Sequence, residues 1–165
     1  PLGRSNRNLP DAFDVDKNHF ELKSATRGSV TTARDVGPHT LREWERRYWI
    51  VAFGDNLSSG FKIRELYIAH PDDLKPFFNK LNAGFAEKWK RCEEVLDVAR
   101  RAGASTEALE TAAAIMNRGI TQNNPHISRS VIVKNGTRIS EANPTQARAQ
   151  IRGFVKNRPL RPTAS

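Results

Sequence analysis

Residues 48–53 read Tyr-Trp-Ile-Val-Ala-Phe, a continuous apolar run that is typical of a strand buried on both faces. Outward from it, Pro38 and Thr40 precede a segment with Leu41 and Trp44 on one face, which predicts a helix over residues 41–47. On the other side, a turn over residues 55–60 leads to a second predicted strand over residues 63–69. Helices that alternate with apolar strands in this way predict an α/β fold.

The segment before this core predicts a β-hairpin. Residues 11–15 and 18–24 have strand character, and Asp-Lys-Asn at residues 16–18 suits the turn between them. Within the second strand the period of two places Glu21 and Lys23 on one face and Phe20 and Leu22 on the other. We therefore expect Leu22 to point into the core.

The remainder of the chain is mostly helical in pattern. Residues 84–118 predict a helical hairpin broken at Gly103, whose apolar stripe suits either core packing or a dimer contact. Residues 130–134, Ser-Val-Ile-Val-Lys, predict a strand before the Asn135-Gly136 turn, and residues 145–156 predict a basic helix. We expect one domain over residues 1–156, with a mixed central β-sheet flanked by helices and the hairpin as an insertion. Residues 157–165 are expected to form a disordered basic tail.

Composition narrows the functional classes. The 165-residue chain carries 27 Lys and Arg against 18 Asp and Glu, a net charge of +9 that favours a polyanionic partner, above all nucleic acid. No apolar run is long enough to span a membrane, and the single cysteine fits a reducing compartment, so we expect a cytoplasmic protein. The four histidines, His19, His39, His70 and His126, lack metal-ligand spacing, and no zinc site is expected.

The predicted hairpin carries the chemistry. Asp11 and Glu21 are carboxylates on neighbouring strands that can converge on one Mg²⁺ ion, and the backbone carbonyl of Leu22 offers a further oxygen ligand. Bound Mg²⁺ would polarise a phosphodiester and activate water, while Lys23 would orient or deprotonate that water and offset developing charge. Asp14 and Asp16 compete for the ligand role, but Asp14 would face the other side of a regular strand and Asp16 sits in the turn.

From Gly3 to Ile139 the chain resembles the PD-(D/E)xK type II restriction endonucleases. The resemblance rests on several segments in the same order: Asp-Ala-Phe-Asp at 11–14, Phe-Glu-Leu-Lys-Ser at 20–24, Trp-Ile-Val-Ala at 49–52, Pro-Asp-Asp-Leu at 71–74 with Phe-Phe at 77–78, Asn-Asn-Pro at 123–125 and Asn-Gly-Thr-Arg-Ile at 135–139. It implies a restriction-endonuclease-like core, Mg²⁺ held by Asp11 and Glu21, and water assisted by Lys23. It also implies a homodimer that cuts double-stranded DNA in a bacterial or archaeal cytoplasm, paired with a cognate DNA methyltransferase.

Two polar segments, Thr32–Asp35 and Gln122–His126, are the candidates for reading bases, one from each side of the metal site. The resemblance implies that Asn123 and Asn124 contact adenine, a task that suits an amide. Thr32, Arg34 and Asp35 replace a run of histidines in the family; Arg34 suits guanine and Asp35 suits the cytosine amine. His126 is a further candidate for DNA contact, and Arg158 for contact with the phosphate backbone.

Three questions stay open at this level. The family's dimerisation region precedes its catalytic Asp, and little precedes Asp11 here, so dimerisation through the helical insertion and through a missing N-terminal segment are both possible. A structure-selective or repair nuclease of the same superfamily would share the metal site without strict sequence reading. A non-catalytic basic DNA-binding domain is disfavoured, because two carboxylates beside phosphate would weaken binding unless a cation intervened.

Overall fold

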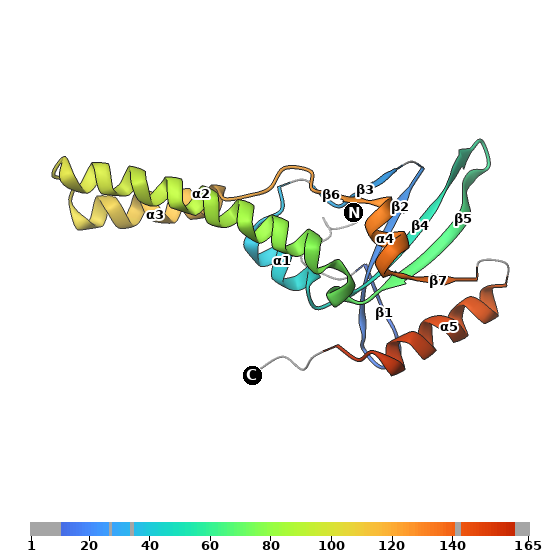
Figure 1. The fold of residues 1–165 in the computed structure, drawn as a ribbon. Helices are drawn as coiled ribbons and strands as arrows, with labels where there is room; N and C mark the ends of the chain where they lie inside the picture. Colours follow the sequence, from blue (N-terminus) through green and yellow to red (C-terminus); the bar gives the residue numbers. More distant parts are fainter. Residues whose placement is uncertain (1–10, 27, 34, 141–142, 161–165) are drawn as a thin grey trace, which may run out of the picture.

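A computed structural model of the chain describes residues 11–26, 28–33, 35–140 and 143–160. Its centre is a five-stranded sheet in the order β1-β2-β4-β5-β7 (Figure 1). The strands are β1 (Ala12–Phe13), β2 (His19–Ala25), β4 (Tyr48–Leu57), β5 (Gly60–Ala69) and β7 (Thr137–Ile139). Strands β2 and β4 run parallel and the other neighbours antiparallel, so the predicted mixed sheet is confirmed.

The apolar run at residues 48–53 is the buried central strand that the sequence predicts. Trp49, Val51 and Phe53 pack into one core cluster, whereas Tyr48 belongs to a second cluster on the opposite face. Strand β4 continues to Leu57, beyond the predicted end, because it forms a long antiparallel hairpin with β5. Gly60 turns this hairpin with a φ of 120°, which a residue with a side chain rarely adopts.

Helices cover both faces of the sheet. On the face of Trp49, the helix α1 (Pro38–Trp44) and the first turns of α2 (Lys75–Arg101) contribute Leu41, Trp44, Phe77 and Phe85 to the core. On the other face, α5 (Pro144–Asn157) packs through its apolar side chains beside Tyr48 and Phe20. The 3-10 helix η1 (Pro71–Leu74) connects β5 to α2.

A helical hairpin of α2 and α3 (Thr106–Gly119) projects from this body (Figure 1). The predicted break lies at Gly103, which has a φ of 89°. Helix α2 starts at Lys75 rather than near residue 84, because its first three turns supply core residues before the helix leaves the sheet. No residue of α3 is buried, although Leu109 and Met116 are partly covered.

The predicted strand at residues 130–134 is wrong, since these residues lie in the helix α4 (Arg129–Asn135). Burial explains the error: Ile132 is fully buried and Val131 packs against the core, but Val133 is 46% exposed, as one face of a helix requires. A short Val-Ile-Val run fits a strand and a buried helical turn equally well. The predicted turn at Asn135-Gly136 ends α4 and leads into β7.

The disordered tail expected from residue 157 is wrong for residues 157–160. Asn157 ends α5, and the Arg158 guanidinium binds both carboxylate oxygens of Asp73 at 2.7 and 2.8 Å. The Tyr48 hydroxyl donates to the Arg158 carbonyl at 2.7 Å, and Leu160 packs beside the α5 cluster. Within the described part of the chain, no helix is both long enough and apolar enough to cross a membrane.

Candidate active site

The three residues predicted to form an active site lie together at the β1 edge of the sheet. The Lys23 Nζ is 2.6 Å from Glu21 Oε1 and 3.5 Å from Asp11 Oδ2. The Leu22 backbone N–H donates to Asp11 Oδ2 at 2.8 Å, which fixes the Asp11 carboxylate against β2. Both carboxylates therefore point toward one position of positive charge, here held by the ammonium.

Strand pairing explains this convergence. Ala12 lies opposite Phe20 in the antiparallel β1–β2 pair, and the Asp11 N–H donates to the Phe20 carbonyl at 3.0 Å. Asp11 is thereby set beside Glu21 on the same face, and the period of two adds Lys23. Glu21 and Lys23 therefore lie on one face of β2, as the strand period of two predicts.

Leu22 lies on the opposite face, as predicted, but it does not enter the core. Its side chain is 43% exposed, whereas Phe20 on the same face is buried against the α5 cluster. The prediction that Leu22 points into the core is wrong, because the packing of α5 reaches Phe20 and does not cover the next position along the edge.

The backbone of Leu22 faces the same edge as Asp11. In a strand, the N–H and C=O of one residue point to the same side, and the Leu22 N–H already bonds the Asp11 side chain. The Leu22 carbonyl therefore lies on the β1 side, as its predicted role as an oxygen ligand requires. With two carboxylates, it makes an all-oxygen donor set of the kind that Mg²⁺ prefers.

Arg47 is a member of this site that the sequence reasoning missed. Its side chain is 1% exposed, and its Nη1 is 2.9 Å from Glu21 Oε2. Glu21, itself 5% exposed, is thus held between two cations, one on each carboxylate oxygen. The one available signal was its position directly before the buried strand that starts at Tyr48.

The competing carboxylates in the hairpin have other partners or positions. Asp14 Oδ1 accepts from the backbone N–H groups of Asp16 and Asn18 at 3.0 and 2.9 Å, so Asp14 stabilises the turn. Asp16 is exposed at that turn. Among the residues the structure describes, no group of three or more His, Cys, Asp or Glu side chains is arranged to hold a metal ion. The carboxylate part of the candidate site therefore consists of Asp11 and Glu21.

The two segments expected to read bases lie beside each other. Strands β3 (Ser29–Thr31) and β6 (His126–Ser128) form a two-stranded antiparallel sheet, in which Thr31 is opposite His126. Backbone bonds extend the pairing to Val36 and Gln122. The expectation that the segments flank the metal site from opposite sides is wrong, because these hydrogen bonds hold them in one unit.

Within this unit the candidate residues differ in accessibility. Thr32 is 9% exposed and its hydroxyl donates to the Pro125 carbonyl at 2.8 Å, so its side chain joins the two segments. Asp35, Asn123 and His126 are exposed, and Asn124 is half-buried. Asp35 and Asn124 have φ angles of 52° and 45°, a turn conformation that these residue types tolerate. Arg34 lies outside the described residues.

A cavity of about 310 Å³ lies between β2 and this unit. Ser24, directly after Lys23, lines it from β2, and Thr31 lines it from β3. Ser24 and Thr31 thus line the space between the carboxylate site and the β3–β6 sheet.

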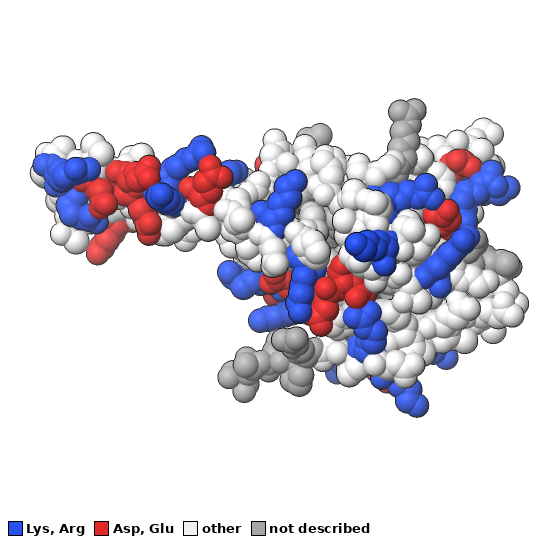
Figure 2. Space-filling view, in the orientation of Figure 1, with Lys and Arg blue, Asp and Glu red and all other residues white. Residues whose placement is uncertain are grey.

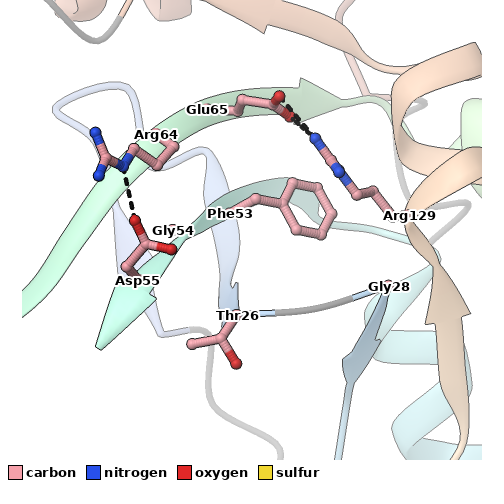
Figure 3. Close-up of a pocket in the computed structure, with 8 residues that line it drawn as sticks. All are labelled: Thr26, Gly28, Phe53, Gly54, Asp55, Arg64, Glu65 and Arg129. Atoms are coloured by element: carbon pink, nitrogen blue, oxygen red, sulfur yellow. Dashed lines mark hydrogen bonds and ion pairs between the residues drawn. The ribbon is translucent and has the colours of Figure 1, made fainter. Parts of the chain in front are cut away.

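A second cavity of about 220 Å³ lies farther along the sheet (Figure 3). Its two arginines are engaged: Arg129 binds both oxygens of Glu65 at 2.7 Å, and Arg64 binds Asp55 at 2.7 Å. The hydrogen bonds from Arg129 lower the pKa of Glu65, and the same guanidinium lies over the Phe53 ring. These contacts attach α4 to the sheet.

Comparison with known proteins gives no relative, since neither a family model nor a curated protein sequence matches the chain.

Proposed function

We propose that the chain is a Mg²⁺-dependent endonuclease that cuts double-stranded DNA at a specific sequence. The observation that carries the proposal is the meeting of Asp11, Glu21 and Lys23 at one sheet edge, with both carboxylates directed at a shared cationic position. The sequence resemblance to PD-(D/E)xK restriction enzymes supports the same assignment, and the net charge of +9 suits a polyanionic substrate.

In this proposal Asp11, Glu21 and the Leu22 carbonyl hold the metal. Bound Mg²⁺ would polarise the phosphodiester and make its attacking water more acidic. Lys23 orients the water and offsets the negative charge that grows on the phosphate oxygens. Hydrolysis joins the water oxygen to phosphorus and breaks one P–O bond, and the departing oxygen takes up a proton. Arg47 acts through Glu21, whose carboxylate it keeps in place.

Sequence reading belongs to the β3–β6 unit in this proposal. Asp35, Asn123, Asn124 and His126 are its candidate base contacts, and we also assign Arg34 to this group from its sequence. The buried Thr32 hydroxyl instead keeps the two segments together. We further propose that the enzyme acts as a homodimer and that a cognate methyltransferase protects its sites.

Plasmid digestion tests the proposal. Unmethylated plasmid and Mg²⁺ should give discrete fragments, and excess EDTA should abolish cleavage. Asp11→Asn and Glu21→Gln should abolish it as well, and Lys23→Ala should reduce turnover by about 10² or more. Asp16 is an exposed carboxylate of the same hairpin, so Asp16→Asn is the matched control and should retain activity.

The fragment pattern separates the alternatives. A smear instead of bands would indicate a structure-selective or repair nuclease, and the ends of discrete fragments would give the recognition sequence. Full activity of Asp11→Asn, or activity in EDTA, would contradict the metal site.

A further inference from the structure

Helix α5 carries a row of cations with no acid in its sequence. Arg148, Arg152 and Lys156 follow one another at intervals of four residues between Pro144 and Asn157, and all three are exposed. Successive cations therefore lie about 40° apart around the helix and about 6 Å apart along it. Ala147, Ile151 and other apolar residues of α5 face the sheet, so the cations form a row along one flank of the helix.

The middle of this row lies beside the hairpin that carries part of the candidate active site. Arg152, the middle cation, lines a cavity of about 370 Å³ together with residues 13–16 of the β1–β2 hairpin. Strand β1 is the edge strand, and Asp11 directly precedes it. Helix α5 packs on the face of the sheet opposite to Glu21, so a long polyanion that meets both the cation row and the carboxylates must pass around the β1 edge.

The row differs from several other arginines of the chain, because those bind acids. Arg64, Arg91, Arg100, Arg129 and Arg158 each pair with Asp or Glu. In residues 11–26, 28–33, 35–140 and 143–160, no acidic side chain forms an ion pair with any of the three cations of α5. Asp14 lines the same cavity as Arg152, but its carboxylate accepts the hydrogen bonds of the hairpin turn.

The geometry points to Arg148, Arg152 and Lys156 as a binding track for the phosphate backbone of double-stranded DNA. This inference rests on the proposed function, and it assigns the non-specific part of DNA binding to α5. It also replaces Arg158 in that role, since the Arg158 guanidinium is held by Asp73. Cations that contact phosphates release counterions, so the contribution of the track should depend on salt.

The test is a series of binding measurements at several salt concentrations. The probe is a short labelled DNA duplex of arbitrary sequence in EDTA, where the proposed enzyme cannot cut it. A triple Gln variant of the track keeps the helix and removes the three charges. The control is a triple Gln variant with the same loss of charge on the projecting hairpin, where cations and acids are interspersed (Figure 2). It replaces Lys90, Arg91 and Arg100, which are all exposed.

The slope of log affinity against log salt is negative, and the track variant should reduce its magnitude by about three, or about 0.9 for each lost phosphate contact. Arg152→Gln alone should lower it by about one, and the hairpin control should leave it unchanged. Equal slopes for the track and control variants would overturn the inference, whether both fell or neither did.

The outcomes also separate this inference from the proposed function. A track-specific loss of slope in a protein that never cleaves plasmid would support the DNA-binding track and reject the nuclease. If instead the wild-type protein cleaves plasmid but the track variant has the same salt dependence of DNA binding as the wild type, the nuclease would be supported and the DNA-binding track rejected.

Discussion

Glu21 is a buried carboxylate, and it depends on fixed positive partners. It is 5% exposed, and Arg47, which binds its Oε2, is 1% exposed. Removing one member of a buried ion pair leaves an uncompensated charge at a cost of about 3–5 kcal/mol. We expect Arg47→Met to lower the free energy of unfolding by about this amount, measured by urea denaturation.

Two further variants make the Arg47 prediction specific. Arg46→Met removes an exposed arginine at the neighbouring position and should change stability little. Adding Glu21→Gln to Arg47→Met should recover part of the loss, because the carboxylate left without its arginine is then neutral. Strictly additive effects of the two substitutions would show that Arg47 does not stabilise the protein through Glu21.

At the scale of residues, local pattern predicts the site only in part. Glu21 and Lys23 share a face because of the strand period, and Asp11 joins them because a hairpin sets two strands side by side. Arg47 could not be found in this way, since its meeting with Glu21 requires β4 to pair with β2 in the register that sets Tyr48 opposite Phe20. The exposure of Leu22 likewise depends on how far α5 extends over the sheet, which no local pattern encodes.

At the scale of elements, length and two-sided burial decide which predictions are correct. Strand β4 is long and buried on both faces, so its apolar run was diagnostic. In α4 the apolar triplet is as short as one helical turn, and tertiary packing selected the helix. The pairing of β3 with β6 joins segments nearly a hundred residues apart, a distance over which sequence pattern alone gives no register.

The start of η1 has a pH-sensitive cap. His70 is 7% exposed, and its Nδ1 accepts from the Asp72 N–H at 3.2 Å. Burial lowers the pKa of His70; Arg158 acts in the same direction, whereas Asp72 and Asp73 oppose it. Above the ordinary pKa of about 6.5 the ring is neutral both folded and unfolded. As the pH falls below that value, the unfolded chain takes up a proton that the folded ring resists, so the protein loses stability.

We therefore expect the free energy of unfolding to fall between pH 7 and pH 5, and to fall less in His70→Asn. Asparagine does not titrate and can still accept a hydrogen bond at the cap. Denaturation curves of both proteins at matched pH values give the comparison. The other histidines and the carboxylates are common to both proteins, so parallel pH profiles would exclude His70 as the cause.

At the scale of the whole molecule, the projecting hairpin has an apolar face of its own. Val95 and Val98 on α2 are 54% and 60% exposed, and Ile115 on α3 is 60% exposed. With 100° per residue and antiparallel helices, these side chains lie on the same face of the hairpin, while Asp97 and Glu110 lie on the other. An exposed apolar face on two helices that bury little between them is typical of an association surface.

A second copy of the chain is the occupant that this face predicts, because its charges are self-complementary. Glu94 and Arg101 flank Val98 two turns apart on α2, so an antiparallel two-fold pairing brings each against its opposite on the partner. We expect the wild-type protein to sediment as a dimer and Val98→Glu to sediment as a folded monomer. Leu57→Glu, which changes an exposed apolar residue of the sheet, should remain dimeric.

Glu94→Arg and Arg101→Glu should each weaken the dimer through like-charge contacts, and the double swap should restore it. A monomeric wild-type protein, or a double swap no better than its single members, would exclude this pairing and leave the N-terminal region as the place to look for the dimer contact.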